Sequence, residues 1–224
     1  MSTTVAAYQL VETDEGVRGR HTRIPLEDLG EGDVLIRVTH SSVNYKDGLA
    51  ATGRAPIARR LPLVGGCCAA GTVVEPGESG LPADTVVAVV GATLSEQHNG
   101  GYCEYLRVPA AWVVAVPEAF TSRQAAAIGT AGVTSAMAVV KLEDAGVTPE
   151  SGPIAVTGAS GGAGSLAVAL LAARGYEVTA LTGKPEAEDL LRDLGAANVA
   201  PRPDTSGTRP LERGTWAGAV DTVG

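Results

Sequence analysis

The order of apolar and polar positions divides the chain into two halves of different texture. In the first half, short apolar runs alternate with turn-forming glycine, proline and asparagine, a pattern typical of strands joined by tight turns. Several short strands at this spacing predict a small barrel or sandwich. Between the second and third strands, Asn44–Ala51 predicts one or two helical turns. The predicted strands are Val5–Leu10, Val34–Thr39, Gly71–Val74, Thr85–Val90, Tyr102–Val108 and Trp112–Val116.

From Ser122 onward the pattern changes to helix-forming residues and then to alternating strands and helices. A long helix is predicted over Ser122–Leu142, and Pro149–Pro153 closes that segment. Alternation of strands and helices predicts βαβ units on a parallel sheet. A polar connection over Pro201–Arg213 precedes the last strand. In chain order the elements are strand Ile154–Thr157, helix Ser165–Arg174, strand Glu177–Leu181, helix Pro185–Leu194, and strands Asn198–Ala200 and Ala217–Val223.

The glycine-rich turn after the first of these strands carries the clearest chemical signal. Residues 154–164 read Ile-Ala-Val-Thr-Gly-Ala-Ser-Gly-Gly-Ala-Gly, and the last six form an A-x-G-x-x-G version of the dinucleotide-binding fingerprint. In such a turn Gly161 lets the backbone approach a pyrophosphate, and Gly164 lets the helix pack closely on its strand. A helix N-terminus at this place favours an anion. An ordinary tight turn between a strand and a helix is the alternative.

The end of the second parallel strand distinguishes between cofactors. An acidic residue there binds the ribose hydroxyls of NAD, but this chain has Thr182-Gly183-Lys184, with no carboxylate before Glu186. A hydroxyl and a cation suit the 2′-phosphate of NADP instead. Arg202, just after the third strand, adds a second cation. The alternative is that Lys184 and Arg202 are simply solvated.

Composition and charge narrow the class of protein. With 224 residues and 45% hydrophobic positions, the chain is long and apolar enough to bury a core. A net charge of −8 excludes a broad nucleic-acid-binding surface. Three cysteines without a C-x-x-C pair indicate a reduced, cytoplasmic protein. The longest apolar stretch, Ala125–Val140, is shorter than the roughly 20 residues that a membrane span requires.

Six stretches along the whole chain together resemble one enzyme family. The chain is similar to the zinc-independent medium-chain dehydrogenases/reductases, and within them to the YhdH-type quinone oxidoreductases, also known as acrylyl-CoA reductases. The matching stretches are Ser-Val-Asn-Tyr-Lys-Asp at 42–47, Gly-Thr-Val at 71–73, Gly-Thr-Ala-Gly-Val-Thr at 129–134, Leu-Glu-Asp-Ala-Gly-Val at 142–147, Val-Thr-Gly-Ala-Ser-Gly-Gly at 156–162, and Trp-Ala-Gly-Ala-Val-Asp-Thr-Val-Gly at 216–224.

The resemblance implies an α/β protein with a GroES-like β-barrel catalytic domain over residues 1–122. It further implies the first part of an NADP-binding Rossmann domain, a doubly wound parallel sheet, over residues 123–224. The implied activity is hydride transfer from NADPH to an activated alkene, such as acrylyl-CoA or another enoyl thioester, or to a quinone. The implied partners are a small-molecule substrate and, as one compatible assembly, a second copy in a homodimer, with neither nucleic acid nor membrane.

The resemblance also assigns site residues. The cofactor-binding residues are Tyr45, which lies against the nicotinamide, Thr130, the pyrophosphate-binding Ser160, Gly161, Gly162 and Ala163, and Thr182, Gly183, Lys184 and Arg202 around the 2′-phosphate. Reduction of an enoyl thioester also needs a hydrogen-bond donor for the enolate oxygen and a proton donor. Asn44 and Tyr45 suit these catalytic roles, and Asp47 suits the orientation of Lys46 or a water. Alternatively, Asn44 and Asp47 cap the start of a helix, which their spacing also fits.

A comparison with zinc-dependent relatives and two departures from the narrower group affect these expectations. Zinc-dependent relatives have Cys at the position of Asn44 and Gly-His-Glu where this chain has Gly66-Cys67-Cys68, so no metal is expected. The narrower group reads Pro-Gly-Ile-Asp over 65–68, so Cys68 replaces an acidic residue. The family continues beyond the strand that ends at Gly224. A truncated, catalytically inactive relative that binds NADPH or a partner chain is therefore the alternative function, and the sequence leaves the substrate open.

Overall fold

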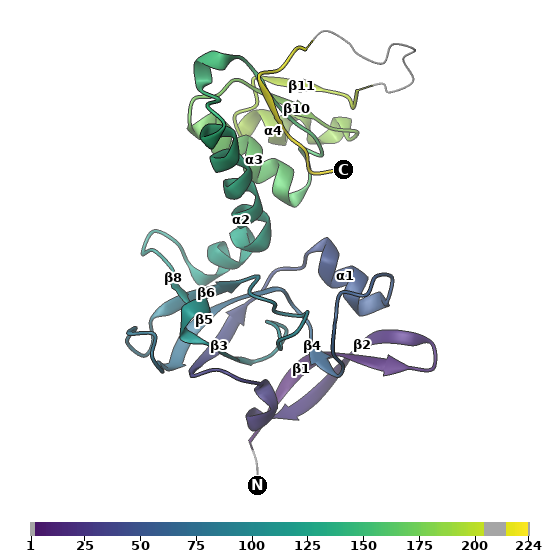
Figure 1. Ribbon diagram of the computed structural model, residues 1–224, viewed down its shortest axis with the longest axis vertical. Coiled ribbons are helices and arrows are strands. Elements are labelled where there is room, and N and C mark those ends of the chain that lie inside the picture. The colour runs from purple at the N-terminus through teal and green to yellow at the C-terminus, as the bar shows by residue number, and fades with distance from the viewer. Residues whose placement is uncertain (1–2, 204–213, 224) are drawn as a thin grey trace. The chain divides into compact units, whose positions relative to one another are not determined.

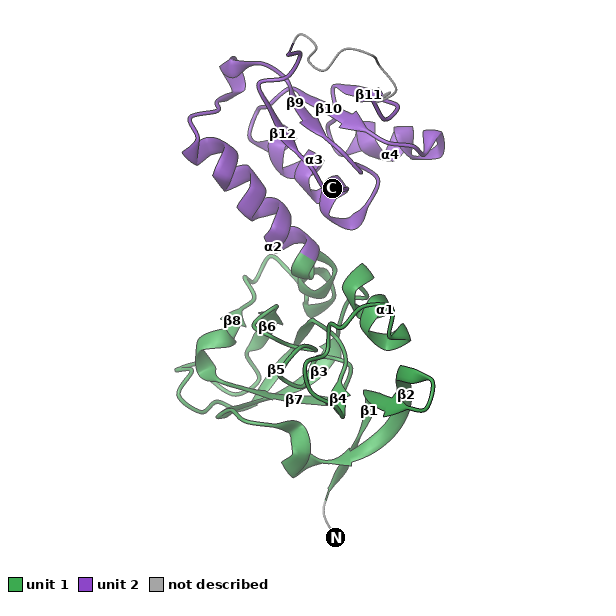
Figure 2. Ribbon diagram, turned by 45° about the vertical axis from the view of Figure 1, so that its right-hand side comes forward, with its two compact units in different colours: residues 1–130 green, residues 131–224 purple. Residues whose placement is uncertain are grey.

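The computed structural model describes residues 3–203 and 214–223, and its elements are labelled in Figure 1. The chain divides into two compact units, residues 1–130 and 131–224 (Figure 2). The division falls inside helix α2 (Ser122–Asp144), directly after a break at Gly129, where φ is 39° and ψ is −142°. The domain boundary expected between residues 122 and 123 stays a prediction.

The first unit consists mainly of two antiparallel sheets, which confirms the β-rich first half. One sheet has the order β2-β1-β4 and the other the order β7-β3-β5-β6-β8. Each sheet buries its own apolar cluster, centred on residues such as Leu29 and Val64 or Ile36 and Leu106. The bounds are β1 Thr4–Thr13, β2 Gly16–Pro25, β3 Val34–His40, β4 Leu63–Val64, β5 Cys68–Glu75, β6 Val86–Val90, β7 Tyr105–Val108 and β8 Val114–Ala115, with helix α1 at Tyr45–Thr52.

Strand β2 was not predicted from the sequence. It pairs with β1 along its whole length, from Thr4 opposite Pro25 to Thr13 opposite Gly16. Ile24 is its one buried residue. An edge strand with little burial lacks the apolar alternation that identifies strands, and it takes its conformation from cross-strand pairing.

The second unit is built on a parallel sheet, which confirms the expected βαβ units. The strand order is β11-β10-β9-β12, which in chain order is 3-2-1-4, as in the first part of a doubly wound dinucleotide-binding sheet. Such folds bind ligands outside the carboxyl ends of the strands where the order reverses, here between β9 and β12. The bounds are β9 Ile154–Val156, α3 Gly162–Ala173, β10 Val178–Leu181, α4 Glu188–Asp193, β11 Asn198–Ala200 and β12 Gly218–Val220.

One predicted helix start is wrong, and one predicted helix-terminating glycine is confirmed. Helix α3 begins at Gly162 with Gly161 as its N-cap, three residues before the predicted start at Ser165. The glycines of the turn therefore enter the first helical turn, where the backbone amides face outward for an anion. After α4, Gly195 has a φ of 99° and its N–H bonds to Arg192 O, as the expected C-terminal glycine should. Most of the predicted Pro201–Arg213 connection, and Gly224, lie outside the described residues.

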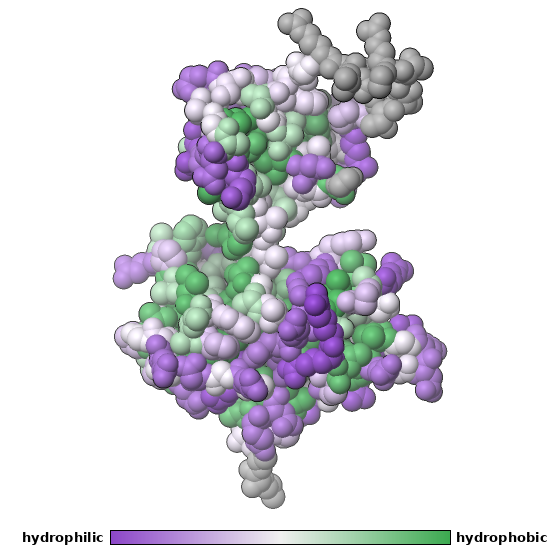
Figure 3. Space-filling model, in the orientation of Figure 1, coloured by the Kyte–Doolittle hydropathy of each residue, from purple (hydrophilic) through white to green (hydrophobic). Residues whose placement is uncertain are grey.

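Helix α2 is the one helix among the described residues that is long and apolar enough to match a membrane span. The break at Gly129 interrupts it, and the part that follows, residues 130–144, is shorter than the roughly 20 residues a span requires. Val139 on this helix is buried in the apolar core of the second unit. Apolar and polar residues are interspersed over the visible surface of each unit (Figure 3).

Candidate functional site

The glycine turn lies between β9 and α3, at the carboxyl end of the sheet. Gly158 has a φ of 56°, and the N–H of Gly161 donates to Gly158 O at 2.8 Å. A methyl group at Gly158 would lie 2.6 Å from Thr222 Oγ1, in the segment that follows β12. The turn is therefore packed against the neighbouring strand across the point where the strand order reverses.

Gly164 is a second position in this turn, after Gly158, that tolerates no side chain. A methyl group there would lie 2.3 Å from Gly158 O and 2.7 Å from the Ala159 Cα. At Gly162 the nearest atom to such a methyl group is the Ala131 Cβ at 3.5 Å, an ordinary contact. The close approach of α3 to its strand, inferred from the fingerprint, therefore depends on Gly164.

Substitution of these two glycines by alanine should change stability in opposite directions. Gly164→Ala is expected to lower the free energy of unfolding by about 2 kcal/mol, because the backbone around Gly158 must shift. Gly162→Ala, the control, should be neutral or stabilising by up to about 1 kcal/mol, since alanine reduces the entropy lost on helix formation. Urea denaturation measures both, and equal effects of the two substitutions would contradict the packing described.

Ser135 holds the start of α3 in place and was missed by the sequence reasoning. Its hydroxyl is buried and lies 2.7 Å from Ala163 O and 2.8 Å from Ala131 O. The sequence feature that could have identified Ser135 is a hydroxyl residue within an otherwise apolar stretch of the long helix. Such a residue often bonds to a backbone carbonyl in the preceding turn.

Thr182 connects the turns that follow β9 and β10. Its side chain is buried, and its Oγ1 lies 3.0 Å from Ser160 Oγ and accepts the Lys184 N–H at 3.1 Å. The hydroxyls of Ser160 and Thr182 therefore lie together at the carboxyl edge of the sheet. Their proximity follows from the parallel pairing of β9 and β10, whose carboxyl ends meet at the same edge of the sheet.

Two cations follow the ends of β10 and β11. A Cβ at Gly183 would lie 3.2 Å from Arg202 Nε and 3.5 Å from its Cζ, so the guanidinium group lies directly against this glycine. Lys184 is exposed one residue further along. The nearest carboxylate in the sequence after β10, Glu186, is also exposed. Glycine at 183 thus leaves room for Arg202, and the arrangement suits a phosphate group.

In the first unit, Asn44 and Asp47 form a capping box at the start of α1. The Asn44 N–H donates to Asp47 Oδ2 at 2.9 Å, and the Asn44 side chain caps the first turn. Asp47 is 5% exposed, and its Oδ1 also accepts the Cys67 N–H at 3.0 Å. The carboxylate therefore joins α1 to the residues just before β5. Tyr45, between the two capping residues, is 85% exposed.

The two adjacent cysteines extend this network. Cys67 Sγ lies 3.2 Å from Asn44 Nδ2 and 3.3 Å from Thr130 Oγ1. Cys68 Sγ lies 2.8 Å from the hydroxyl oxygen of Ser42. Sequence reasoning singled out Asn44, Asp47 and Thr130 separately, and the structure brings all three around Cys67.

Tyr102 borders the same cluster. Its hydroxyl donates to the backbone carbonyl of Ser42 at 3.0 Å. Burial, reinforced by the nearby Asp47 carboxylate, raises the pKa of Tyr102, so the phenol remains a hydrogen-bond donor at neutral pH.

The predicted site residues therefore fall into two groups. Residues near the carboxyl edge of the parallel sheet in the second unit are Ser160, Gly161, Gly162, Ala163, Thr182, Gly183, Lys184 and Arg202. Residues of the first unit are Asn44, Tyr45, Asp47 and Thr130. No group of three or more His, Cys, Asp or Glu side chains that could hold a metal ion occurs in the described part of the chain.

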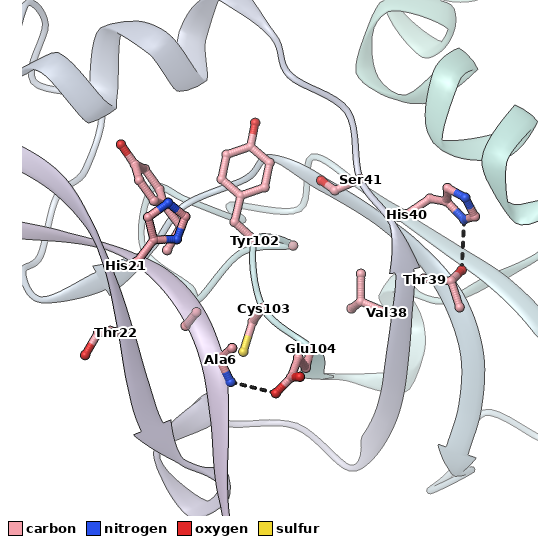
Figure 4. Close-up of a pocket in the computed structure, with 13 residues that line it drawn as sticks. Ala6, His21, Thr22, Val38, Thr39, His40, Ser41, Tyr102, Cys103 and Glu104 are labelled. Atoms are coloured by element: carbon pink, nitrogen blue, oxygen red, sulfur yellow. Dashed lines mark hydrogen bonds between the residues drawn. The ribbon is translucent and has the colours of Figure 1, made fainter.

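A pocket of about 660 Å³ opens between the strands of the first unit (Figure 4). His21 comes from β2, Val38 and His40 from β3, and Glu104 accepts the Ala6 N–H at 2.7 Å. The residues that line it include neither lysine nor arginine. This pocket consequently lacks the cations that bind the phosphates of a dinucleotide.

Comparison with known proteins agrees with both halves of the fold. The alcohol dehydrogenase GroES-like domain matches residues 30–118. The crystal structure of the YhdH oxidoreductase of Salmonella enterica in complex with NADP superposes with a TM-score of 0.91 at 42% identity, over 98% of this chain and 68% of that one. A GroES-like domain joined to this parallel sheet defines a medium-chain dehydrogenase/reductase.

Two further relatives narrow the class. The probable acrylyl-CoA reductase AcuI of Escherichia coli is 48% identical over 88% of this chain and 60% of its own length. The putative quinone oxidoreductase YhfP of Bacillus subtilis is 42% identical over all of this chain and 68% of its own length. Its crystal structure with NAD bound has a TM-score of 0.92. The chain belongs to the YhdH-type quinone oxidoreductase and acrylyl-CoA reductase family, and it spans 60–68% of the length of these relatives.

Proposed function

We propose that the chain acts as an NADPH-dependent reductase of an activated alkene, such as acrylyl-CoA or another enoyl thioester, or of a quinone. The observation that carries the proposal is the pair of cations, Lys184 and Arg202, beside an A-x-G-x-x-G turn on a 3-2-1-4 parallel sheet. Anion binding at a helix N-terminus and bidentate binding by arginine are the two usual ways in which proteins hold dinucleotide phosphates. The relatives named acrylyl-CoA reductase and quinone oxidoreductase support the substrate class.

The second unit supplies the phosphate-binding residues of the proposal. The backbone around Ser160, Gly161, Gly162 and Ala163 is the cradle for the pyrophosphate, since a side chain at Gly161 would crowd Gly158 O at 3.2 Å. Thr182, Gly183, Lys184 and Arg202 hold the 2′-phosphate. NADP in the Salmonella YhdH structure supports this choice, whereas YhfP was solved with NAD.

The first unit supplies the residues near the reacting atoms. NADPH supplies the hydride when bound, and the exposed ring of Tyr45 is available to contact its nicotinamide and to donate a hydrogen bond or proton. The contacts of Asn44 and Asp47 with each other and with Cys67 support a positioning role, in which both residues fix the start of α1 and therefore Tyr45. Thr130, bonded to Cys67, belongs to the same arrangement.

The proposal also covers the substrate, the oligomeric state, the cellular location and the metal requirement. The partner is a small-molecule substrate, and a homodimer and a cytoplasmic location are proposed by resemblance to bacterial relatives. Metal-free chemistry is likewise proposed from the residues at positions 44 and 66–68. None of these features involves a nucleic acid or a membrane.

Turnover tests the proposal directly. NADPH oxidation is followed by absorbance with acrylyl-CoA and, separately, with a small benzoquinone. We expect oxidation of NADPH with at least one of them, at a rate that saturates with substrate. A folded sample that binds NADPH but oxidises it with neither acceptor would contradict the proposed activity.

Binding of NADPH without its oxidation by either acceptor would support the alternative function. In that case the chain is a catalytically inactive relative that binds NADPH or a partner chain. One observation favours it: Cys68 stands where the narrower family group has an acidic residue. A thiol that keeps its proton lacks the charge of a carboxylate. Binding without turnover therefore separates the two functions.

A further inference from the structure

The segment that follows β12 has no role in the proposed function, although it belongs to one of the stretches that carry the family resemblance. Strand β12 pairs in parallel with β9, so the carboxyl ends of the two strands lie side by side (Figure 2). The glycine turn follows β9, and Asp221, Thr222 and Val223 follow β12. These two ends meet where the strand order reverses, which is where such sheets bind their ligands.

Thr157, between β9 and the turn, directs all of its polar groups at this segment. Its N–H donates to Val220 O at 3.0 Å, and its carbonyl oxygen accepts the Thr222 hydroxyl at 2.9 Å. Its own hydroxyl donates to Asp221 Oδ1 and accepts the Thr222 N–H at 3.0 Å. Asp221 Oδ1 also accepts the Val223 N–H at 3.1 Å. The two ends are therefore joined by side chains as well as by the strand pairing.

The carboxylate of Asp221 sets the direction of these hydrogen bonds. An ionised carboxylate is an acceptor only, so the Thr157 hydroxyl is the donor in the bond between them. Because a hydroxyl has one hydrogen and two lone pairs, the Thr157 oxygen is left to accept the Thr222 N–H. The hydrogen of the Thr222 hydroxyl is directed at the Thr157 carbonyl. We call Thr157, Asp221 and Thr222 the Thr157 network.

The Thr157 network acts on the first residue of the glycine turn. The Thr157 carbonyl and the Gly158 N–H belong to one planar peptide unit, so the bond from Thr222 sets the orientation of that unit. Gly158 has a φ of 56°, and glycine by itself permits many other values. Gly158 O then accepts the Gly161 N–H at 2.8 Å. The orientation of the first peptide unit therefore influences the residues that approach the pyrophosphate.

We propose that Thr157 is a positioning residue for the cofactor, held by Asp221 and Thr222 so that the glycine turn presents its N–H groups to a pyrophosphate. This inference rests on the proposed function, because it concerns the same turn. Anion binding at a helix N-terminus needs several N–H groups aimed at one point, and a preorganised set loses less conformational entropy when the anion binds.

The strand order separates this role from that of the 2′-phosphate residues. Strands β12 and β10 lie on opposite sides of β9. The Thr157 network joins β9 to β12, whereas Lys184 and Arg202 follow β10 and β11. The network should therefore affect binding of the pyrophosphate, which NADPH and NADH share, and leave binding of the 2′-phosphate unchanged.

Hydrogen exchange of the ligand-free chain tests the network without a cofactor. Thr157→Val keeps the branched shape and the backbone bonds but removes the hydroxyl, so amides of residues 158–164 should exchange about fivefold faster, the effect of one hydrogen bond on local opening. Thr157→Ser, which keeps the hydroxyl, should exchange as the parent chain does. Thr179→Val, in the half-buried middle of β10, is the matched control and should leave the turn unchanged. Unchanged exchange of the turn in Thr157→Val would overturn the proposal.

Titration with three ligands then tests the positioning role. NADPH and NADH contain the pyrophosphate, whereas 2′-AMP has adenosine and the 2′-phosphate without it. Thr157→Val should weaken NADPH and NADH by the same factor, about tenfold, the effect of losing one hydrogen bond to a charged group. The affinity for 2′-AMP should stay the same, and Thr157→Ser should restore the affinity for both dinucleotides. Equal weakening of all three ligands, or no recovery in Thr157→Ser, would contradict the positioning role.

The outcomes also separate this inference from the proposed function. Replacement of Lys184 and Arg202 should change the ratio of the NADPH and NADH affinities, whereas Thr157→Val should leave that ratio unchanged. A parent chain that binds none of the three ligands would contradict the proposed function and the positioning role together. A parent chain that binds NADPH no more tightly than Thr157→Val does would contradict the positioning role alone.

Discussion

Replacement of both Lys184 and Arg202 by glutamate is expected to weaken NADPH binding by roughly a thousandfold. Each cation contributes a charge-assisted hydrogen bond worth about 1.5–3 kcal/mol, and the two together correspond to about two to four powers of ten in the dissociation constant. NADH lacks the 2′-phosphate, so its affinity should change by less than about threefold, the effect of a screened change in net charge. Isothermal titration calorimetry with each cofactor measures the difference.

A matched control separates this local effect from total charge. Lys141 and Arg192 are exposed cations of the same unit, paired with Asp144 and Glu188, and their joint replacement by glutamate gives the same change in net charge. This control variant should bind NADPH nearly as the parent chain does. If both double variants lost NADPH equally, or if the Lys184 and Arg202 variant lost NADH as strongly as NADPH, the 2′-phosphate assignment would be wrong.

Asp47→Ala is expected to lower the free energy of unfolding of the first unit by about 3 kcal/mol. The substitution removes the acceptor for the Asn44 and Cys67 N–H groups and the capping box of α1. A buried donor left without a partner costs about 1–3 kcal/mol, and a lost N-terminal helix cap about 1 kcal/mol. Urea denaturation followed by circular dichroism measures the change.

Asp14→Ala provides the comparison for Asp47. Asp14 is exposed in the turn between β1 and β2, and its replacement should change stability by less than about 0.5 kcal/mol. Asp47→Asn keeps one carbonyl acceptor, so its loss of unfolding free energy should lie between the losses of Asp47→Ala and Asp14→Ala. Equal stability of the Asp47 and Asp14 variants would contradict the role of this carboxylate as the link between α1 and β5.

The parts of the fold that the sequence predicted well are those specified by nearby residues. The β9–turn–α3 unit follows from a local apolar run, four glycines and a helix-forming stretch. The placement of Arg202 near Gly183 follows from the rule that parallel strands end at the same edge. These inferences need no knowledge of distant contacts.

The parts that were missed depend on contacts between distant residues. The pattern over Ser122–Leu142 predicts a helix but does not place its break at Gly129, where a methyl group would lie 3.1 Å from Ser42 Oγ and 3.4 Å from Cys68 Sγ. No local pattern indicates that three segments so far apart in sequence meet. The same holds for the contact between Ser42 and Cys68, 26 residues apart, and for β2, whose order comes from its pairing with β1.

The central claim, that the parallel-sheet unit selects NADPH, is tested most directly by titration of the unmodified chain with NADPH and with NADH. Calorimetry gives the affinity and stoichiometry of each cofactor under the same conditions. The account predicts one site per chain and an affinity for NADPH at least about tenfold higher than for NADH, from the charge-assisted contacts of Lys184 and Arg202. A folded chain that binds neither cofactor, or that binds NADH as tightly as NADPH, would contradict it.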